Sequence, residues 1–155
     1  MNEQSNRPWI KPNPALKNME VLVGEWDLQG AHPFISGPVR GHATFEWLEG
    51  GAFLIWRTYF EQPLPPNGLA VIGRDDTTGS CSMVYYDERG VSRIYEMMVE
   101  GNIWRMWRNA PGFMQRMTGE ISDDRNTITV HGELSKDGSN WEQDLDLIYT
   151  RRSEV

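Results

Sequence analysis

Turn signals recur at short, even intervals through most of this 155-residue chain. Between them lie runs such as "HATFEWLEG" and "NTITVHG", in which apolar and polar residues alternate with period two. This period is typical of β-strands with one dry and one wet face. After residue 68 a turn follows about every ten to thirteen residues, which leaves no room for the crossover helices that a parallel sheet needs. The sequence therefore predicts an antiparallel up-and-down meander.

The fold class expected from this meander is all-β, an up-and-down antiparallel β-barrel of about ten strands. Closure into a barrel removes the two unpaired edges that an open sheet of this size would expose. Before the first strand, "NPALKNMEVLVG" predicts a short N-terminal helix with Asn13 as its N-cap. We expect a flexible N-terminal arm at residues 1–13 and a single barrel domain at 14–152. The strands are expected at residues 24–32, 38–49, 51–61, 68–75, 80–87, 91–99, 102–109, 113–121, 126–134 and 140–151.

Charge and cysteine content exclude several classes of function. The net charge of −7, from 15 Lys and Arg against 22 Asp and Glu, argues against a nucleic-acid partner, which normally needs a basic face. The single cysteine, Cys81, permits no intrachain disulfide and no zinc site of clustered thiolates. The N-terminus lacks the apolar core of a secretory signal, and no apolar run reaches the roughly 20 residues of a membrane span. We expect a cytoplasmic protein.

The triplet Gly24-x-Trp26 at the start of the first strand is interpreted as a closure device. In a closed barrel with an even number of strands, the start of the first strand lies beside the end of the last one, which carries Arg151. An indole there can plug the floor of the barrel, and a guanidinium can lie over the indole face. Gly24 gives the preceding helix room to close beneath them. We assign Gly24, Trp26 and Arg151 to barrel closure.

The order of helix, Gly-x-Trp, meander and terminal "LIYTR" resembles the calycin superfamily, which includes lipocalins and fatty-acid-binding proteins. The longer pattern "LVGEWDLQGAHP", "GHATFEWLEGGAFLIWR" and "GLAVIGRDDTTGSCSMVYYDERG" is similar to a family of bacterial lipocalin-like domains, over about residues 16–151. The resemblance implies a barrel that binds a small ligand. Unlike many lipocalins the chain can form no disulfide, and "PFISGP" is too short for the helical lid of fatty-acid-binding proteins. A lidless ten-stranded barrel also resembles the nitrobindins, which bind haem through a histidine in the C-terminal part of the barrel, but "NWEQDLDLIYTR" contains none.

About ten strands should enclose a cavity, and seven Trp with eight Met suit its wall. An arginine and tyrosine group inside an apolar cavity is what a carboxylate ligand needs, because the guanidinium offers a bidentate fork. The alternative is that these arginines face outward and pair with surface carboxylates, and the parity of residues 53–60 stays open. The candidate ligand-binding residues are His32, Arg57, Tyr59, Tyr86, Arg93, Tyr95, Arg105 and Trp107.

No catalytic or metal motif is present: the three histidines lack paired spacing, and the acidic stretches "GRDDTTG" and "SKDGSN" have turn composition. We therefore expect no catalytic residue, no metal and no cofactor. The first interpretation is non-enzymatic binding of a small apolar or amphipathic molecule, carboxylate-bearing in one version. The alternatives, in order, are an interaction protein that forms a homodimer through an exposed aromatic patch, an enzyme built in the same barrel, and a haem protein using His32 or His131.

Overall fold

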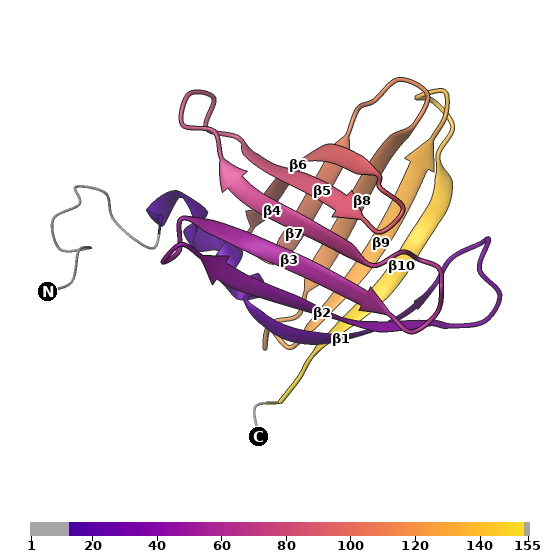
Figure 1. The fold of residues 1–155 in the computed structure, drawn as a ribbon, viewed down its shortest axis with the longest axis horizontal. Helices are drawn as coiled ribbons and strands as arrows, with labels where there is room; N and C mark the ends of the chain where they lie inside the picture. The colour runs from indigo at the N-terminus through magenta and orange to yellow at the C-terminus, as the bar shows by residue number, and fades with distance from the viewer. Residues whose placement is uncertain (1–12, 154–155) are drawn as a thin grey trace, which may run out of the picture.

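A computed structural model describes residues 13–153, in which ten antiparallel strands form one closed barrel (Figure 1). The predicted all-β barrel is therefore confirmed, whereas the arm expected at residues 1–13 lies, apart from Asn13, outside the described residues. Every strand pairs with its neighbours in sequence, and the first strand pairs with the last. The strands are β1 (Gly24–Ala31), β2 (Val39–Leu48), β3 (Phe53–Phe60), β4 (Gly68–Arg74), β5 (Cys81–Asp87), β6 (Ser92–Glu100), β7 (Ile103–Arg108), β8 (Met114–Ile121), β9 (Thr127–Ser135) and β10 (Glu142–Arg151).

The predicted helix is a short 3-10 helix, η2 (Pro14–Leu22), at one end of the barrel (Figure 1). It begins where expected, because the side chain of Asn13 accepts a hydrogen bond of 3.0 Å from the backbone N–H of Ala15. Its apolar residues Leu16, Met19 and Leu22 are buried in the core. We call the end covered by η2 the floor and the opposite end the mouth. No helix in residues 13–153 is long and apolar enough to cross a membrane.

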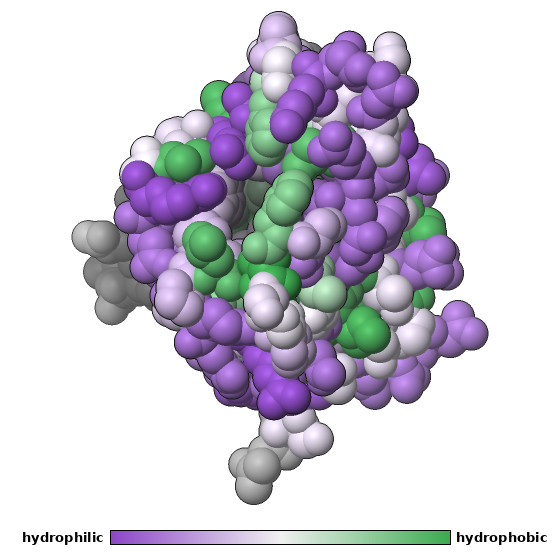
Figure 2. Space-filling model, turned by 90° about the vertical axis from the view of Figure 1, so that its right-hand side faces the viewer, coloured by the Kyte–Doolittle hydropathy of each residue, from purple (hydrophilic) through white to green (hydrophobic). Residues whose placement is uncertain are grey.

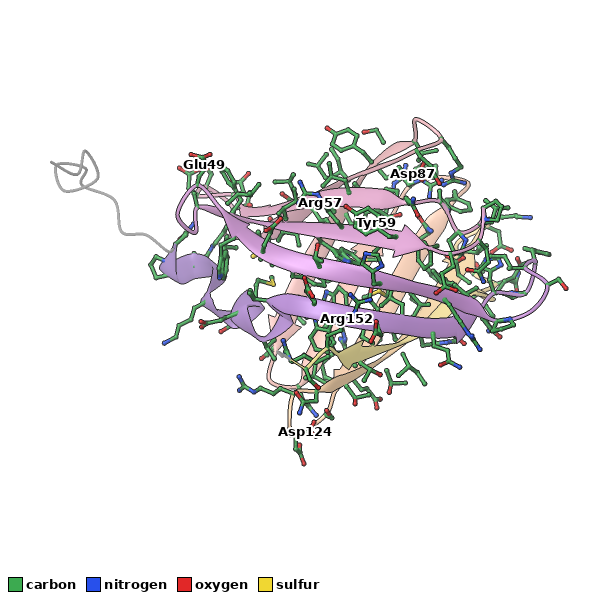
Figure 3. All side chains as sticks on the ribbon, turned by 60° about the horizontal axis from the view of Figure 1, so that its bottom comes forward. Glu49, Arg57, Tyr59, Asp87, Asp124 and Arg152 are labelled. Atoms are coloured by element: carbon green, nitrogen blue, oxygen red, sulfur yellow. The ribbon has the colours of Figure 1, made fainter. Side chains whose placement is uncertain are left out.

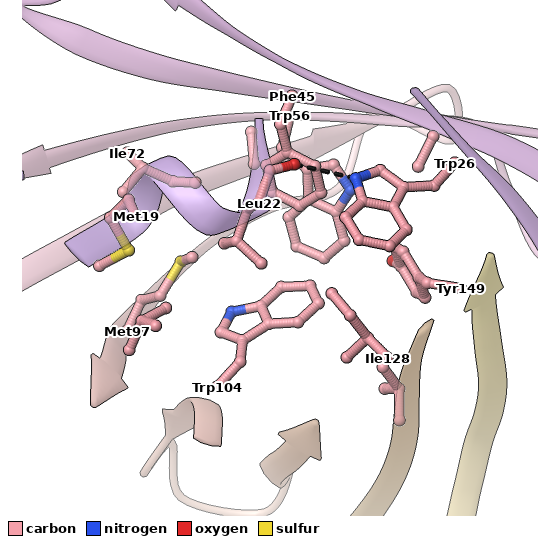
Figure 4. Close-up of a cluster of buried hydrophobic side chains, with 14 of the residues drawn as sticks. Met19, Leu22, Trp26, Phe45, Trp56, Ile72, Met97, Trp104, Ile128 and Tyr149 are labelled. Atoms are coloured by element: carbon pink, nitrogen blue, oxygen red, sulfur yellow. Dashed lines mark hydrogen bonds between the residues drawn. The ribbon is translucent and has the colours of Figure 1, made fainter. Parts of the chain in front are cut away.

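Closely packed aromatic rings fill the barrel above the floor (Figure 4). The ring of Trp104 is at the centre, with its centroid 5.3 Å from that of Trp56 and 5.7 Å from those of Phe45 and Tyr149. The rings meet edge to face, the arrangement that aromatic quadrupoles favour. Trp26 packs at the side of this group and donates a hydrogen bond of 2.9 Å from Nε1 to the carbonyl oxygen of Leu22. Side chains therefore seal this end of the barrel, and any open interior lies toward the mouth.

Arg151 joins the last strand to the first at the floor. Its guanidinium carbon lies 4.2 Å from the centroid of the Trp26 ring, so the predicted cation–π contact is confirmed. The same guanidinium donates hydrogen bonds of 2.8 Å and 2.7 Å to the carbonyl oxygens of Val21 and Val23. Gly24 has φ of 132°, and a Cβ there would stand 2.7 Å from Nη1 of Arg151. A residue without a side chain is thus needed where the guanidinium crosses the chain.

A β-bulge interrupts the pairing of β9 with β10. The register shifts by one residue between Gln143 and Asp146, so that Asp144 and Leu145 together face Gly132. A bulge places two successive side chains where regular alternation would place one. Both Asp144 and Leu145 consequently line the interior of the barrel. The alternation in the sequence assigns Asp144 to the wet face, and the bulge overturns that assignment.

Candidate functional site

A cavity of about 510 Å³ occupies the half of the barrel nearest the mouth. Its inner wall is mainly apolar, and the loops after β1 and β3 border its opening with Phe34, Leu64 and two prolines. Figure 2, which faces this end of the molecule, shows a hollow bordered by apolar side chains within a largely polar surface. The inner lining includes Trp56, Ala70, Met83, Met106, Met117, Val130, Leu147 and Tyr149. The cavity thus has a closed apolar floor and one open end.

A chain of hydrogen bonds runs along the wall near the mouth. The hydroxyl of Tyr95 donates to Oε1 of Gln115 at 2.6 Å, and Nε2 of Gln115 donates to Oδ2 of Asp144 at 3.2 Å. The other carboxylate oxygen of Asp144 lies 3.1 Å from Nε2 of His32. Strands β6, β8 and β10 and the loop directly after β1 each supply one member, so this chain depends on barrel closure for its geometry.

The proton positions in this chain follow from what each group can donate. An ionised carboxylate only accepts, so both Gln115 and His32 must donate to Asp144. The backbone N–H of Phe34 donates to Nδ1 of His32 at 3.0 Å. His32 is therefore neutral, with its proton on Nε2, and both ring nitrogens are occupied. In this arrangement neither nitrogen can act as a general base or bind a metal.

Arg93 contributes the positive charge to the same wall. Its guanidinium lies 5.0 Å from the ring centroid of Phe113, and Nη1 is 3.5 Å from Oε1 of Gln115. Within residues 13–153, no carboxylate oxygen lies within 4.0 Å of this guanidinium. Burial raises the pKa of the adjacent Tyr95, so its hydroxyl stays protonated and acts as a donor. The cavity therefore contains one arginine whose charge is not neutralised by a neighbouring acid.

A second polar group, at the turn after β5, is satisfied internally. The buried carboxylate of Asp87 accepts hydrogen bonds of 2.8 Å from the hydroxyl of Tyr85 and 2.7 Å from Nη2 of Arg89. The Arg89 guanidinium lowers the pKa of Asp87 well below its usual range. Burial, and then the bond to Asp87, raise the pKa of Tyr85. These contacts fix the Tyr85 ring in the cavity wall and pair the charge of Arg89 with that of Asp87.

Three of the eight candidate ligand-binding residues, His32, Arg93 and Tyr95, line the cavity. The other five do not, and their expected inward orientation is wrong; they are Arg57, Tyr59, Tyr86, Arg105 and Trp107. Each lies on the outer face, because the inward positions of β3, β5 and β7 are taken by Trp56, Tyr85 and Met106.

Two of these outward residues have partners on β2. Arg57 forms an ion pair of 2.7 Å with Glu46, as expected in the alternative that the arginines face outward and pair with surface carboxylates. The ring of Tyr59 stacks on that of His42, with 4.8 Å between the ring centroids. Figure 3 shows both Arg57 and Tyr59 on β3.

The three histidines are spread over the barrel and make separate contacts. His131 is on the outer face, with Nδ1 2.6 Å from Oδ1 of Asp146, and His42 stacks outside the barrel on Tyr59. His32 is the histidine of the cavity wall, and its two nitrogens are occupied. Among the described residues, no group of three or more His, Cys, Asp or Glu side chains could hold a metal ion.

Four site residues were missed from the sequence: Trp56, Tyr85, Gln115 and Asp144. Trp56 and Tyr85 precede Arg57 and Tyr86, which were expected to face inward. Assigning the wrong face on β3 and on β5 therefore hid them. Gln115 shares the parity of Met117, a signal that was available in "FMQRMTG". Only Gly132, opposite the bulge, hinted at the position of Asp144.

Comparisons with known proteins show the fold alone. No protein-family model and no curated protein matches the chain. Among solved structures, the chain is similar to the crystal structure of Rv2717c from M. tuberculosis, with a TM-score of 0.61 and 16% sequence identity. The match covers 90% of this chain and 98% of that one. The barrel thus has a close counterpart in architecture, while the residues of the cavity must be interpreted from their own chemistry.

Proposed function

We propose that this protein binds a small amphipathic molecule with an anionic group, without converting it. The observation that carries the proposal is an apolar cavity of about 510 Å³ with an arginine, Arg93, that has no acidic partner within 4.0 Å in the described chain. Small-molecule sites commonly have this size and combine an apolar wall with a few polar groups that fix orientation. The apolar part of the ligand would lie on the floor side, and its polar end would lie near the mouth.

The anionic group follows from the cost of an unpaired guanidinium. Removing a charge from water is unfavourable unless a partner compensates, and Arg93 is half-buried against Phe113. A carboxylate can accept two parallel hydrogen bonds from a guanidinium, whereas a neutral hydroxyl cannot pair with its charge. Arg93 therefore gains more from an anionic ligand than from a neutral one.

An enzyme in the same cavity is less well supported. Its histidine has both nitrogens occupied, and Tyr85 and Tyr95 have raised pKa values, so neither is an ionised base at neutral pH.

The closed meander also favours membership of the calycin superfamily, and the lone Cys81 favours a reducing compartment such as the bacterial cytoplasm.

The proposal is tested by displacement of a fluorescent probe, anilinonaphthalene sulfonate, by dodecanoate and by dodecanol. We expect dodecanoate to bind more tightly than dodecanol, and Arg93→Leu to weaken dodecanoate about tenfold or more without affecting dodecanol. The matched control is Arg57→Leu, which removes an arginine from the outer face. Failure of dodecanoate and dodecanol to displace a probe bound in the cavity, or equal losses in both variants, would refute the proposal.

A second candidate is self-association through the outer face of β4 to β6. Ile94 is 65% exposed and Tyr86 is 48% exposed, and Ile94 pairs across the sheet with Val84, which in turn pairs with Val71. Contiguous exposed apolar side chains often mark an interface. If this face forms a homodimer, Ile94→Asp will shift sedimentation toward the monomer while probe binding is retained. A wild-type protein that is monomeric at high concentration would exclude it.

A further inference from the structure

We infer that the ligand carries an N–H donor next to its anionic group, and that Asp144 binds this donor. The inference rests on the proposed function and narrows the class of ligand from amphipathic acids in general to acyl amino acids and related molecules. In these molecules a carboxylate and an N–H group are one carbon apart. Three observations about the cavity wall and one electrostatic argument support it.

The first observation is that Asp144 carries a charge with no cation beside it. Its carboxylate accepts hydrogen bonds from the neutral groups of His32 and Gln115. No lysine or arginine nitrogen in residues 13–153 lies within 4.0 Å of it. Its side chain is only 21% exposed, so water compensates the charge incompletely. Each carboxylate oxygen accepts one of these hydrogen bonds and can accept a second, so Asp144 retains acceptor capacity.

The second observation is that Gln115 holds two opposite charges apart. Its Oε1 faces Nη1 of Arg93 at 3.5 Å, and its Nε2 faces Oδ2 of Asp144 at 3.2 Å. A direct ion pair between Arg93 and Asp144 would neutralise both groups and leave nothing for a ligand. With the Gln115 carboxamide between them, the wall instead presents a cation on one side of this amide and an anion on the other.

The third observation is the backbone irregularity that points Asp144 inward. The bulge in β10 places this carboxylate in the cavity. Gly132 leaves room for the bulge, because a Cβ atom on this glycine would lie only 3.6 Å from the Cβ atom of Asp144. A regular strand would direct an acidic residue at this position to water at no desolvation cost. Bulges that re-aim a side chain beside a site are a recurrent device.

The electrostatic argument is that the two charges would discriminate between ligands. For a plain fatty acid, repulsion between its carboxylate and Asp144 would offset part of the attraction to Arg93. For an alkylamine bound to Asp144, repulsion from Arg93 would do the same. An N–H next to a carboxylate satisfies both groups at once. A ligand without the N–H would leave the half-buried Asp144 carboxylate without this hydrogen bond, and such a loss strongly reduces affinity.

The test compares N-dodecanoylglycine, which has this N–H, with N-dodecanoylsarcosine, in which a methyl group replaces the hydrogen on the same nitrogen, and uses dodecanoate as the reference. All three are used below their micellar concentrations against the wild-type protein, with probe displacement as the readout. We expect N-dodecanoylglycine to bind about tenfold or more tightly than either of the others. Asp144→Asn should reduce this preference to nearly one, while Asp146→Asn, on the outer face beside His131, should leave it unchanged.

The outcomes separate this inference from the proposed function. If dodecanoate and N-dodecanoylsarcosine bind as tightly as N-dodecanoylglycine in the wild-type protein, Asp144 does not bind a donor, although an amphipathic ligand is still bound. If no acid displaces the probe, the proposed function fails. The wild-type ligand comparison needs no variant, so it decides the question even if Asp144→Asn does not fold.

Discussion

Gly132 lies so close to Leu145 that a Cβ atom on the glycine would stand 2.7 Å from the leucine carbonyl oxygen. The contact is with backbone, which cannot rotate away as a long side chain can. The bulge that carries Asp144 into the cavity is therefore compatible with glycine alone at this position of β9. A substitution of Gly132 should therefore affect both the stability of the barrel and the position of the Asp144 carboxylate.

We expect Gly132→Ala to lower the free energy of unfolding by about 1–3 kcal/mol, because the added methyl group forces the two strands apart. It should also weaken ligand binding, since Asp144 moves with the bulge. Urea unfolding measures the first effect and probe displacement the second. The matched control is Gly73→Ala in β4, where a Cβ meets no heavy atom within 4 Å, and stability should be unchanged or higher. Equal stability of the two variants would contradict the prediction.

Arg151 and its neighbour Arg152 offer a test of barrel closure. Arg151→Gln removes the contact with Trp26 and charged hydrogen bonds to three carbonyl groups, so we expect a loss of about 2–3 kcal/mol in the free energy of unfolding. Arg152 forms an ion pair with Asp27 at the surface, and Arg152→Gln should change stability by less than about 0.5 kcal/mol. Similar losses in both variants would show that the contacts of Arg151 with Trp26 and the backbone carbonyl groups stabilise the barrel no more than a surface ion pair does.

Asp87 should make stability depend on acid pH. The Arg89 guanidinium holds the pKa of Asp87 well below its usual 3.8, so the ionised form stabilises the folded state. This contribution is fully present above the usual carboxyl pKa and is lost as the pH falls below it toward the folded-state value. The stability difference between wild type and Asp87→Asn should be constant near neutral pH and shrink below about pH 3.8. Urea unfolding at several pH values checks this, with the exposed Asp123→Asn as control; a difference that stays constant down to about pH 2 would contradict it.

Two tryptophans on opposite faces of the barrel wall can report where a ligand binds. Trp56 lines the cavity, whereas Trp107 lies on the outer face of β7. A ligand in the cavity should change the emission of Trp56, so Trp56→Phe should remove much of the ligand-induced fluorescence change. Trp107→Phe should retain it. A signal that depends on Trp107 instead would place the bound molecule outside the barrel.

The fold could be predicted because its determinants are local or repeat along the chain. Period-two alternation and evenly spaced turns placed all ten strands, and Asn13 marked the start of η2. Closure through Trp26 and Arg151 followed from topology, since an antiparallel meander with an even strand number must bring those positions together. These inferences needed no knowledge of which face of each strand is inside.

The candidate site was predicted less well because alternation does not define a face when both faces are apolar. On β3 the inward Trp56 and Phe60 alternate with the outward Ile55 and Tyr59, so hydropathy cannot choose between them. Near the mouth the contrast is even reversed, because polar Thr58 and Gln115 face the cavity. Asp144 was hidden for a different reason, since a bulge changes parity within a strand and leaves only a glycine on the neighbouring strand as its trace.

The pairing of β1 with β10 has a consequence for how the chain folds. Nine hairpin connections link strands that are adjacent in sequence, and each can form from a short loop at low entropic cost. The last pairing is different, because Arg151 and Val23 are separated by 128 positions. Such a contact is expected to form late, after the hairpins have brought the ends of the chain together. Arg151 would then act mainly on the rate at which the closed barrel opens, and the hydrogen-bonded wall from Tyr95 to His32 would be completed only in that final step.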